Sequence, residues 1–218
     1  DRTNNTLSGD STVTDGAMGI VITGDNTTNT ISGKSTVDGG TGALISGDGT
    51  NTTLAGDITV SGGGTAIVLD GDSITVDNSG ISHISGAGST GAIITGDNAH
   101  VSNEGELTIT DGGTGSKITG DGALVDNQGN STTSGEGSTG LYIDGNDALV
   151  INEGDQTISG GAAGTKVDGD NTRMINTGDL NVDGAGSAGV TINGDNANIT
   201  ERGDLLVTNG AVGIATTG

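Results

Sequence analysis

The 218-residue sequence predicts an all-β fold, a parallel β-helix in which three short strands make up each coil. A segment of the type G-x-x-I-x-G-D recurs eight times, with successive starts 23, 24, 25, 24, 25, 24 and 25 residues apart. Within each short segment apolar residues alternate with others, which is the period of a β-strand, and no stretch has a helical period. A fixed period of this length is typical of a solenoid. The repeats therefore predict roughly nine stacked coils of 24–25 residues.

Each coil is expected to contain three strands of four or five residues, separated by glycine-bearing corners. In one coil the three segments are residues 91–94, 99–103 and 106–110, and the last ends in the loop 111–114. The chain is interpreted as one domain, 1–218. Residues 1–18 would form a degenerate first coil, residues 19–212 the eight repeats and residues 213–218 a partial last coil. Stacking at ~4.8 Å per coil predicts a rod about 40 Å long.

The composition excludes several classes of function. The chain has 45 glycines, no Pro, Cys, Trp or Phe, and a formal net charge of −22. A phosphate backbone requires clustered Lys and Arg, and single-stranded nucleic acid also requires aromatic platforms, whereas Tyr142 is the only aromatic residue. No apolar run approaches the ~20 residues of a membrane span, and no signal peptide opens the chain. The absence of cysteine excludes disulfides and thiolate metal sites, and it suits an exported protein.

Three columns of apolar residues are expected to fill the narrow core. β-Branched side chains dominate them, as a stacked and pleated core requires. The first column is Ile22, Ile45, Leu69, Ile94, Ile118, Ile143, Val167 and Ile192. The second is Val76, Val101, Val125, Val150, Met174 and Ile199. The third is Val60, Ile84, Ile109, Thr133, Ile158, Val182 and Val207.

Two unbroken glycine columns mark corners, and a positive φ angle is the expected reason for both. The first is Gly24, Gly47, Gly71, Gly96, Gly120, Gly145, Gly169 and Gly194. The second is Gly33, Gly56, Gly80, Gly105, Gly129, Gly154, Gly178 and Gly203.

Two polar columns follow strands. The first is an Asn ladder, whose stacked amides are expected to hydrogen-bond from coil to coil or, alternatively, to form a polar ligand stripe; it consists of Asn78, Asn103, Asn127, Asn152 and Asn176. The second is an Asp ladder at the first corner, consisting of Asp25, Asp48, Asp72, Asp97, Asp121, Asp170 and Asp195, with Asn146 as its neutral member. Aspartate favours turns, where its carboxylate accepts hydrogen bonds from backbone amides. Weak calcium binding is the alternative role of this ladder. No EF-hand or calcium β-roll motif is present, so no metal site is assigned.

One outward position of the first strand forms a candidate interaction stripe. Its first four residues are apolar and are expected to face solvent, and its second half carries two lysines and the tyrosine. The stripe is Val21, Leu44, Val68, Ile93, Lys117, Tyr142 and Lys166. Exposed apolar patches often mark interaction sites. Simple β-propensity, or contact with a neighbouring part of a longer chain, is the alternative explanation.

Catalysis finds little support in the sequence. His83 and His100 fall in different strand classes and are expected on different faces, as surface residues. No repeat departs from the pattern to build a pocket, and no serine is paired in register with a histidine and an acid. We therefore predict no catalytic residues, no cofactor and no enzyme activity.

The repeated T-G-D-N, N-x-G-x-L-x-I and G-G-x-G-T units, together with the cysteine-free composition, resemble the passenger region of a Gram-negative autotransporter adhesin of the self-associating type. The resemblance covers the whole chain and implies a right-handed β-helix exported through the outer membrane to the cell surface. It further implies aggregation, biofilm formation or attachment to host protein or glycan. The expected partner is therefore a second copy or a host surface, with neither nucleic acid nor membrane insertion. The resemblance transfers no binding residues.

Other β-helical functions remain as alternatives. A passive stalk that presents another binding region is compatible with the regular repeats. A polysaccharide-processing enzyme usually carries long loops and aromatic sugar platforms, which this chain lacks. An ice-binding solenoid requires regular threonine columns on one flat face, whereas threonine is scattered among the faces here.

Overall fold

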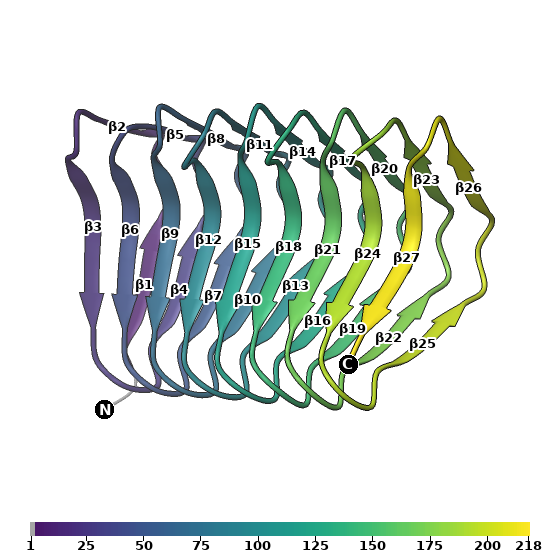
Figure 1. Cartoon of the computed structure of the whole chain (residues 1–218). Helices are drawn as coiled ribbons and strands as arrows, with labels where there is room; N and C mark the ends of the chain where they lie inside the picture. The colour runs from purple at the N-terminus through teal and green to yellow at the C-terminus, as the bar shows by residue number, and fades with distance from the viewer. Residues whose placement is uncertain (1–2) are drawn as a thin grey trace.

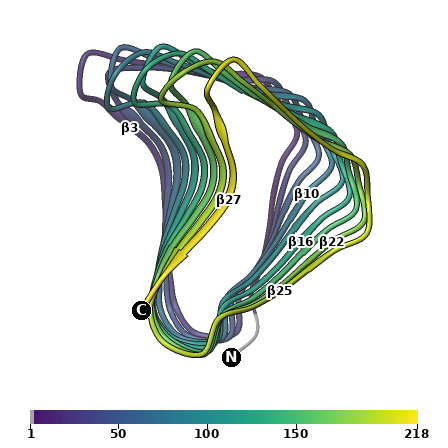
Figure 2. The same ribbon diagram turned by 45° about the vertical axis from the view of Figure 1, so that its right-hand side comes forward.

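The computed structural model describes residues 3–218. Within that range the regular secondary structure consists of β-strands joined by turns, with no helix. The strands form a parallel β-solenoid of about nine coils with three strands in each, as the repeats predict (Figure 1). In Figure 1 the strands at the front run downward and those behind run upward while the chain advances from left to right, so the solenoid is right-handed. The view along the coils shows how closely successive turns superimpose (Figure 2).

Three nine-stranded parallel sheets, here named A, B and C, make up the walls. Sheet A contains β1 (Asn4–Leu7), β4 (Thr28–Ile31), β7 (Asn51–Leu54), β10 (Thr75–Asn78), β13 (His100–Asn103), β16 (Leu124–Asn127), β19 (Leu149–Asn152), β22 (Arg173–Asn176) and β25 (Asn198–Glu201). Sheet B contains β2 (Ser11–Thr14), β5 (Ser35–Asp38), β8 (Ile58–Ser61), β11 (Ser82–Ser85), β14 (Leu107–Thr110), β17 (Ser131–Ser134), β20 (Gln156–Ser159), β23 (Leu180–Asp183) and β26 (Leu205–Thr208). Sheet C contains β3 (Met18–Thr23), β6 (Thr41–Ser46), β9 (Thr65–Asp70), β12 (Thr90–Thr95), β15 (Thr114–Thr119), β18 (Thr139–Asp144), β21 (Ala163–Asp168), β24 (Ala188–Asn193) and β27 (Val212–Thr217).

The first and last coils use the same sheets as the middle ones. Strands β1 and β2 lie within residues 3–18 and pair with β4 and β5, while residues 1 and 2 of the expected first coil lie outside the described part. Strand β27 begins at Val212 and pairs with β24.

The three predicted apolar columns line the interior. Ile45, Ile94, Ile109 and Val150 are each at most 2 % exposed. Val207 belongs to the third column but is 39 % exposed, because no described coil covers β26. The columns therefore place the apolar core along the axis of the rod.

The second column begins with polar residues that the apolar pattern does not reveal. Asn5, Asn29 and Thr52 stand in register with Val76, and Asn29 is 1 % exposed. The Asn5 amide donates to the Asn29 Oδ1 at 2.9 Å, and the Asn29 amide donates to Thr27 at 3.2 Å and Thr52 at 3.4 Å. Since a buried amide is tolerated when it is hydrogen-bonded, these contacts explain why polar residues can continue an apolar column.

The two glycine columns exist for different reasons. At the corner between sheets C and A, six of the eight glycines have a φ between 130° and 150°, which strains any other residue. The glycines between sheets A and B, exemplified by Gly105, have no positive φ, so the prediction for that column was wrong in its reason. A Cβ on Gly105 would lie under 3.0 Å from the carbonyl oxygen of Gly80 in the coil before it. That column is selected by the close approach of successive coils.

Candidate interaction surface

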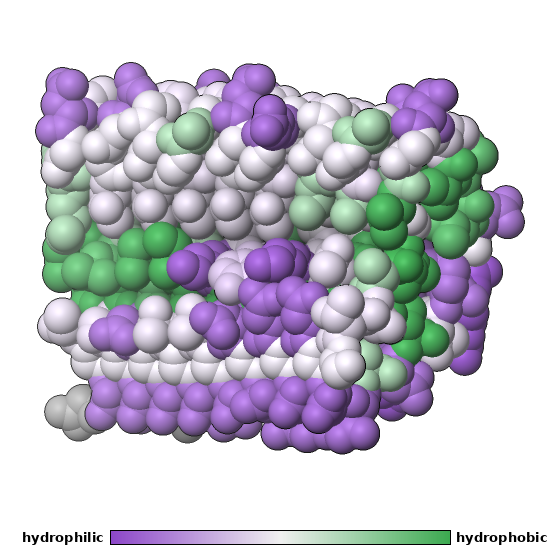
Figure 3. Space-filling view, in the orientation of Figure 1, coloured by the Kyte–Doolittle hydropathy of each residue, from purple (hydrophilic) through white to green (hydrophobic). Residues whose placement is uncertain are grey.

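The candidate interaction stripe runs along the outer face of sheet C. Its residues pair in register from β3 to β21, each lying beside its predecessor. Val21 is 57 % exposed, and Leu44, Val68 and Ile93 are half-buried. Figure 3 shows an apolar patch over β3, β6, β9 and β12, bordered by polar surface. The first half of the stripe is therefore an accessible apolar surface about four coils long.

The other half of the stripe is a cationic cluster around the single aromatic ring. The Lys166 Nζ lies 4.8 Å from the Tyr142 ring centroid, and the Lys117 Nζ lies 5.8 Å from it. Both distances fall within the range of cation–π attraction. Lys166 also forms an ion pair with Asp168 at 2.9 Å, and the Tyr142 hydroxyl donates to the same carboxylate at 2.9 Å.

Hydrogen bonding at this cluster shifts two pKa values in opposite directions. The bond from the phenol to Asp168, together with burial and the negative charges of Asp168 and Asp144, raises the pKa of Tyr142 from 10.0 to about 12. The pKa of Asp168 is lowered, chiefly by the hydrogen bond from Lys166 and further by those from Asn193 and Tyr142. The cluster is therefore a neutral phenol beside a stable carboxylate at neutral pH.

We expect the phenol of Tyr142 to ionise with a midpoint near pH 12, well above the pKa of an ordinary tyrosine. Because the folded chain keeps this proton while the unfolded chain loses it, stability should fall as the pH rises from 10 to 12. Phenolate absorbance during a pH titration measures the midpoint without interference, since no other aromatic residue is present. Asp168→Asn should move the midpoint back toward 10.0, and a wild-type midpoint at 10.0 would contradict the geometry.

The Asp ladder lies at the corner between sheets C and A, and its side chains are exposed. From Asp25 to Asp170, each Oδ1 accepts the backbone N–H of the equivalent residue in the next coil. The bond from the Asp72 amide to Asp48 is 2.9 Å, and the bonds to Asp72 and Asp97 have the same length. Asn146 substitutes as acceptor for the Asp170 amide at 2.9 Å. These bonds stabilise the stacking of the corner, and Figure 3 shows the resulting hydrophilic row along the lower edge.

A second set of acidic acceptors, which the sequence reasoning missed, lies at the corner between sheets A and B. Asp155 and Asp179 accept the amides of Asp179 and Asp204 at 2.9 and 3.0 Å. Asp10 and Asp57 do the same for Lys34 and Ile81. The alternation of Asp with Lys34, Ile81 and other types hid this column. The sequence does mark its position, because each member is the residue that follows a glycine of the second glycine column.

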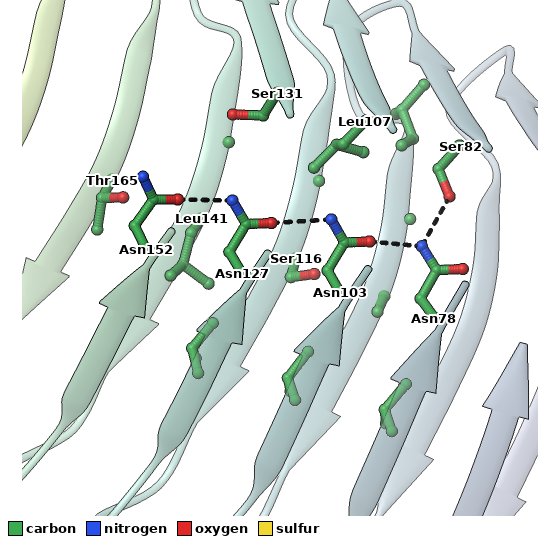
Figure 4. Close-up of a pocket in the computed structure, with 18 of the residues that line it drawn as sticks. Asn78, Ser82, Asn103, Leu107, Ser116, Asn127, Ser131, Leu141, Asn152 and Thr165 are labelled. Carbon is green, nitrogen blue, oxygen red and sulfur yellow. Dashed lines mark hydrogen bonds between the residues drawn. The ribbon is translucent and has the colours of Figure 1, made fainter. Parts of the chain in front are cut away.

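The Asn ladder lies inside the solenoid, at the end of the sheet A strands (Figure 4). The Nδ2 of Asn78 donates to Asn103 at 2.7 Å, Asn103 to Asn127 at 2.8 Å and Asn127 to Asn152 at 2.6 Å. Asn152 donates in turn to Asn176, and Asn176 donates to the Glu201 carboxylate at 2.7 Å. Each amide also donates to the carbonyl of the glycine two residues later, as Asn152 does to Gly154 at 2.8 Å. All five amides therefore point the same way, and a carboxylate receives the last donor.

A second apolar patch, also missed, lies on the outer face of sheet A. Leu124 pairs with Leu149, and Ile151 pairs with Ile175, all four being half-buried. Arg173 is exposed beside Leu149. This patch lies in the C-terminal half of the rod, whereas the apolar half of the stripe lies in the N-terminal half. No repeated residue type marks this patch, because the position of Leu124 and Leu149 carries His100 in the preceding coil and Arg173 in the following one.

The remaining candidate groups are dispersed. His83 is exposed on sheet B and His100 is half-buried on sheet A. Within residues 3–218 no three His, Asp or Glu side chains are grouped so that they could hold a metal ion. None of the described segments is a helix of the length and apolarity that a membrane span requires.

The fold defines the class of protein as a parallel β-solenoid, whose equivalent outward residues form stripes along the rod. No family model and no curated protein matches the chain. Among solved structures it is similar to the crystal structure of a hyper-glycosylated fragment of TibA, whose glycosylation is catalysed by TibC. The identity is 14 %, the match covers 99 % of this chain and 100 % of the other, and the TM-score is 0.20. At that TM-score the likeness carries no argument about function.

Proposed function

We propose that this chain is a non-enzymatic adhesin segment, exported to the bacterial surface, which associates sideways with a second copy of itself. The observation that carries the proposal is the apolar half of the interaction stripe, Val21, Leu44, Val68 and Ile93, which lies accessible and in register on the outer face of parallel sheet C. A contiguous exposed apolar surface on a highly charged rod is typical of an interaction site. The resemblance of the repeats to autotransporter passengers supports the surface location.

The repeated geometry suits association along the rod. A second rod laid on sheet C would cover equivalent outward residues in several coils at once. Each contact would be weak, and their combination would supply avidity without a single dominant residue. The sheet A patch is a second apolar surface on a different face of the rod. A contact between the stripe of one copy and the sheet A patch of the next would therefore join two different surfaces, which makes it heterologous. Such a contact adds further copies instead of closing a dimer.

The net charge sets the conditions under which association is expected. Each copy carries a formal charge of −22, so two rods repel one another at low ionic strength. Salt screens this repulsion, because the Debye length falls from about 30 Å at 0.01 M to about 10 Å at 0.1 M. Apolar contact is not weakened by that screening. Association driven by the stripe should therefore increase with salt, the opposite of association driven by ion pairs.

We expect Val68→Asp combined with Ile93→Asp to abolish association, because the change places two charges in the centre of the apolar stripe. Sedimentation velocity over a concentration series should show dimers or larger species for the wild-type chain and monomers for the variant. Runs with calcium and with a chelator belong to the same series, since a calcium dependence would bring the Asp ladder into the contact.

The matched control is Thr59→Asp combined with His83→Asp. These residues pair on adjacent coils and face outward on sheet B, and the variant adds the same number of acidic residues. It should associate as the wild type does. A wild-type chain that stays monomeric at every salt concentration would overturn self-association and favour a stalk. A stripe variant that associates as well as the control would remove the stripe from the interface.

A further inference from the structure

An elongated internal cavity runs beside the Asn ladder. Its volume is about 90 Å³, and it extends along the coils from Leu54 to Thr165. It exists because small side chains occupy inward positions where other coils carry larger ones. Ser131 stands between Leu107 and Gln156 in sheet B, and Ser116 stands next to Leu141 in sheet C. Figure 4 shows these side chains from sheets B and C converging on the ladder.

Two residues that line this cavity each carry a buried oxygen atom that lacks a hydrogen-bond donor among the described residues. The two atoms are the Oε1 of Gln156, whose side chain is buried at 7 % exposure, and the Oδ1 of Asn78. Neither can be satisfied by turning its amide around. The Nε2 of Gln156 donates to the Asn152 Oδ1 at 3.1 Å, and the Nδ2 of Asn78 donates to the Asn103 Oδ1, so a turned amide would set oxygen against oxygen.

The position of Asn78 explains its unpaired oxygen. Every other asparagine of the ladder accepts a hydrogen bond from the coil before it, but the coil before Asn78 carries Leu54 at this position. The ladder therefore begins with an acceptor that no side chain of the preceding coil can serve. Gln156 is the second case, because Asn152 holds its nitrogen while no donor of the described residues reaches its oxygen.

We propose that this cavity binds a file of water molecules that donate to the Asn78 Oδ1 and the Gln156 Oε1. A water molecule needs about 10–15 Å³ of such volume and two to four polar partners. The cavity has room for several, and its lining includes three hydroxyl-bearing residues, Ser116, Ser131 and Thr165. An apolar occupant would leave both oxygens unpaired, which is unfavourable in a buried site. The ligand chemistry is therefore that of a small hydrogen-bond donor.

The first test is a high-resolution crystal structure of the wild-type chain, collected with and without xenon pressure. We expect density peaks at hydrogen-bonding distance from the Asn78 Oδ1 and the Gln156 Oε1, and no xenon in the cavity. Dry apolar cavities accept xenon readily. Xenon bound beside the Asn ladder, or a cavity without peaks at both oxygens, would overturn the proposal.

The second test counts long-lived internal waters in solution by oxygen-17 magnetic relaxation dispersion. Ser131→Leu fills the cavity with the side chain that Leu107 already supplies in the adjacent coil, and it should lower the wild-type signal by at least one water molecule. Thr132→Leu is the matched control, because Thr132 is the next residue and is exposed. Equal signals from wild type and a folded Ser131→Leu would contradict internal hydration. The wild-type crystal decides the question if that variant does not fold.

Discussion

Replacing Gly105 with alanine is expected to destabilise the solenoid by about 3 kcal/mol or more, because the new methyl group meets backbone that cannot move aside. A Cβ at this position would overlap the carbonyl group of Gly80 and lie near Ser79. These atoms belong to the coil below, so relief would require the two coils to separate locally. Urea unfolding followed by circular dichroism measures the loss as a lower midpoint.

Gly9→Ala is the matched control for this substitution. Gly9 occupies the same corner column, one coil before Gly33, but a Cβ built on it meets nothing within 4 Å. Its replacement should change stability by less than about 0.5 kcal/mol. If both variants unfold at the same urea concentration, close approach of the coils is not the reason for the glycine column.

Asn152→Leu should also cost about 3 kcal/mol or more, although leucine preserves most of the volume. The substitution leaves the carbonyl of Gly154, the Oδ1 of Asn176 and the Nε2 of Gln156 without their partner. Each unsatisfied buried group costs about 1–3 kcal/mol. Leucine itself fits this column, since Leu54 pairs with Asn78, so the loss reports broken hydrogen bonds and not a steric clash.

Asn181→Leu serves as the comparison, because Asn181 faces outward on β23 and is half-buried. Its unfolding midpoint should remain close to that of the wild type. Amide hydrogen exchange adds a local measurement: Asn152→Leu should release protection in the coils on either side of residue 152. Protection unchanged in those coils would show that the Asn ladder is not a source of stability.

The regular part of the fold could be predicted because stacking imposes the same environment on equivalent residues in every coil. Ile45, Ile94 and Ile118 occupy one buried environment, so their spacing alone identified the column. The outward stripe on sheet C followed from the same alternation. The separation of the two histidines onto different sheets followed as well.

Features that mix residue types escaped prediction. Asn29 and Thr52 continue an apolar column because their side chains bond to neighbours along the axis, which a search for apolar residues cannot detect. The second set of acidic acceptors is interrupted by Lys34 and Ile81, so no repeated letter marked it. A positive φ was the wrong explanation for the Gly105 column. The actual cause is the short distance between successive coils, which the sequence alone does not reveal.

The placement of the candidate site was partly predictable. The residues of the stripe were correctly expected to share one outer position, but the ion pair between Lys166 and Asp168 was not anticipated. That pair joins two residues of one strand that both face outward, and its formation depends on side-chain conformations. The internal cavity likewise depends on the volumes of Ser116, Ser131 and their neighbours taken together, which no single column reveals.

The stacking of coils through hydrogen bonds parallel to the axis has a mechanical consequence. The first and last described coils lie at opposite ends of the rod, so a pull that separates them acts along the direction of those bonds (Figure 1). Such a load detaches one coil at a time from an end, since each coil is bonded only to its neighbours. Each detached coil would lengthen the chain by about 80 Å at ~3.3–3.6 Å per residue. Under tension the rod would extend in uniform steps while the coils that remain keep their outer faces intact.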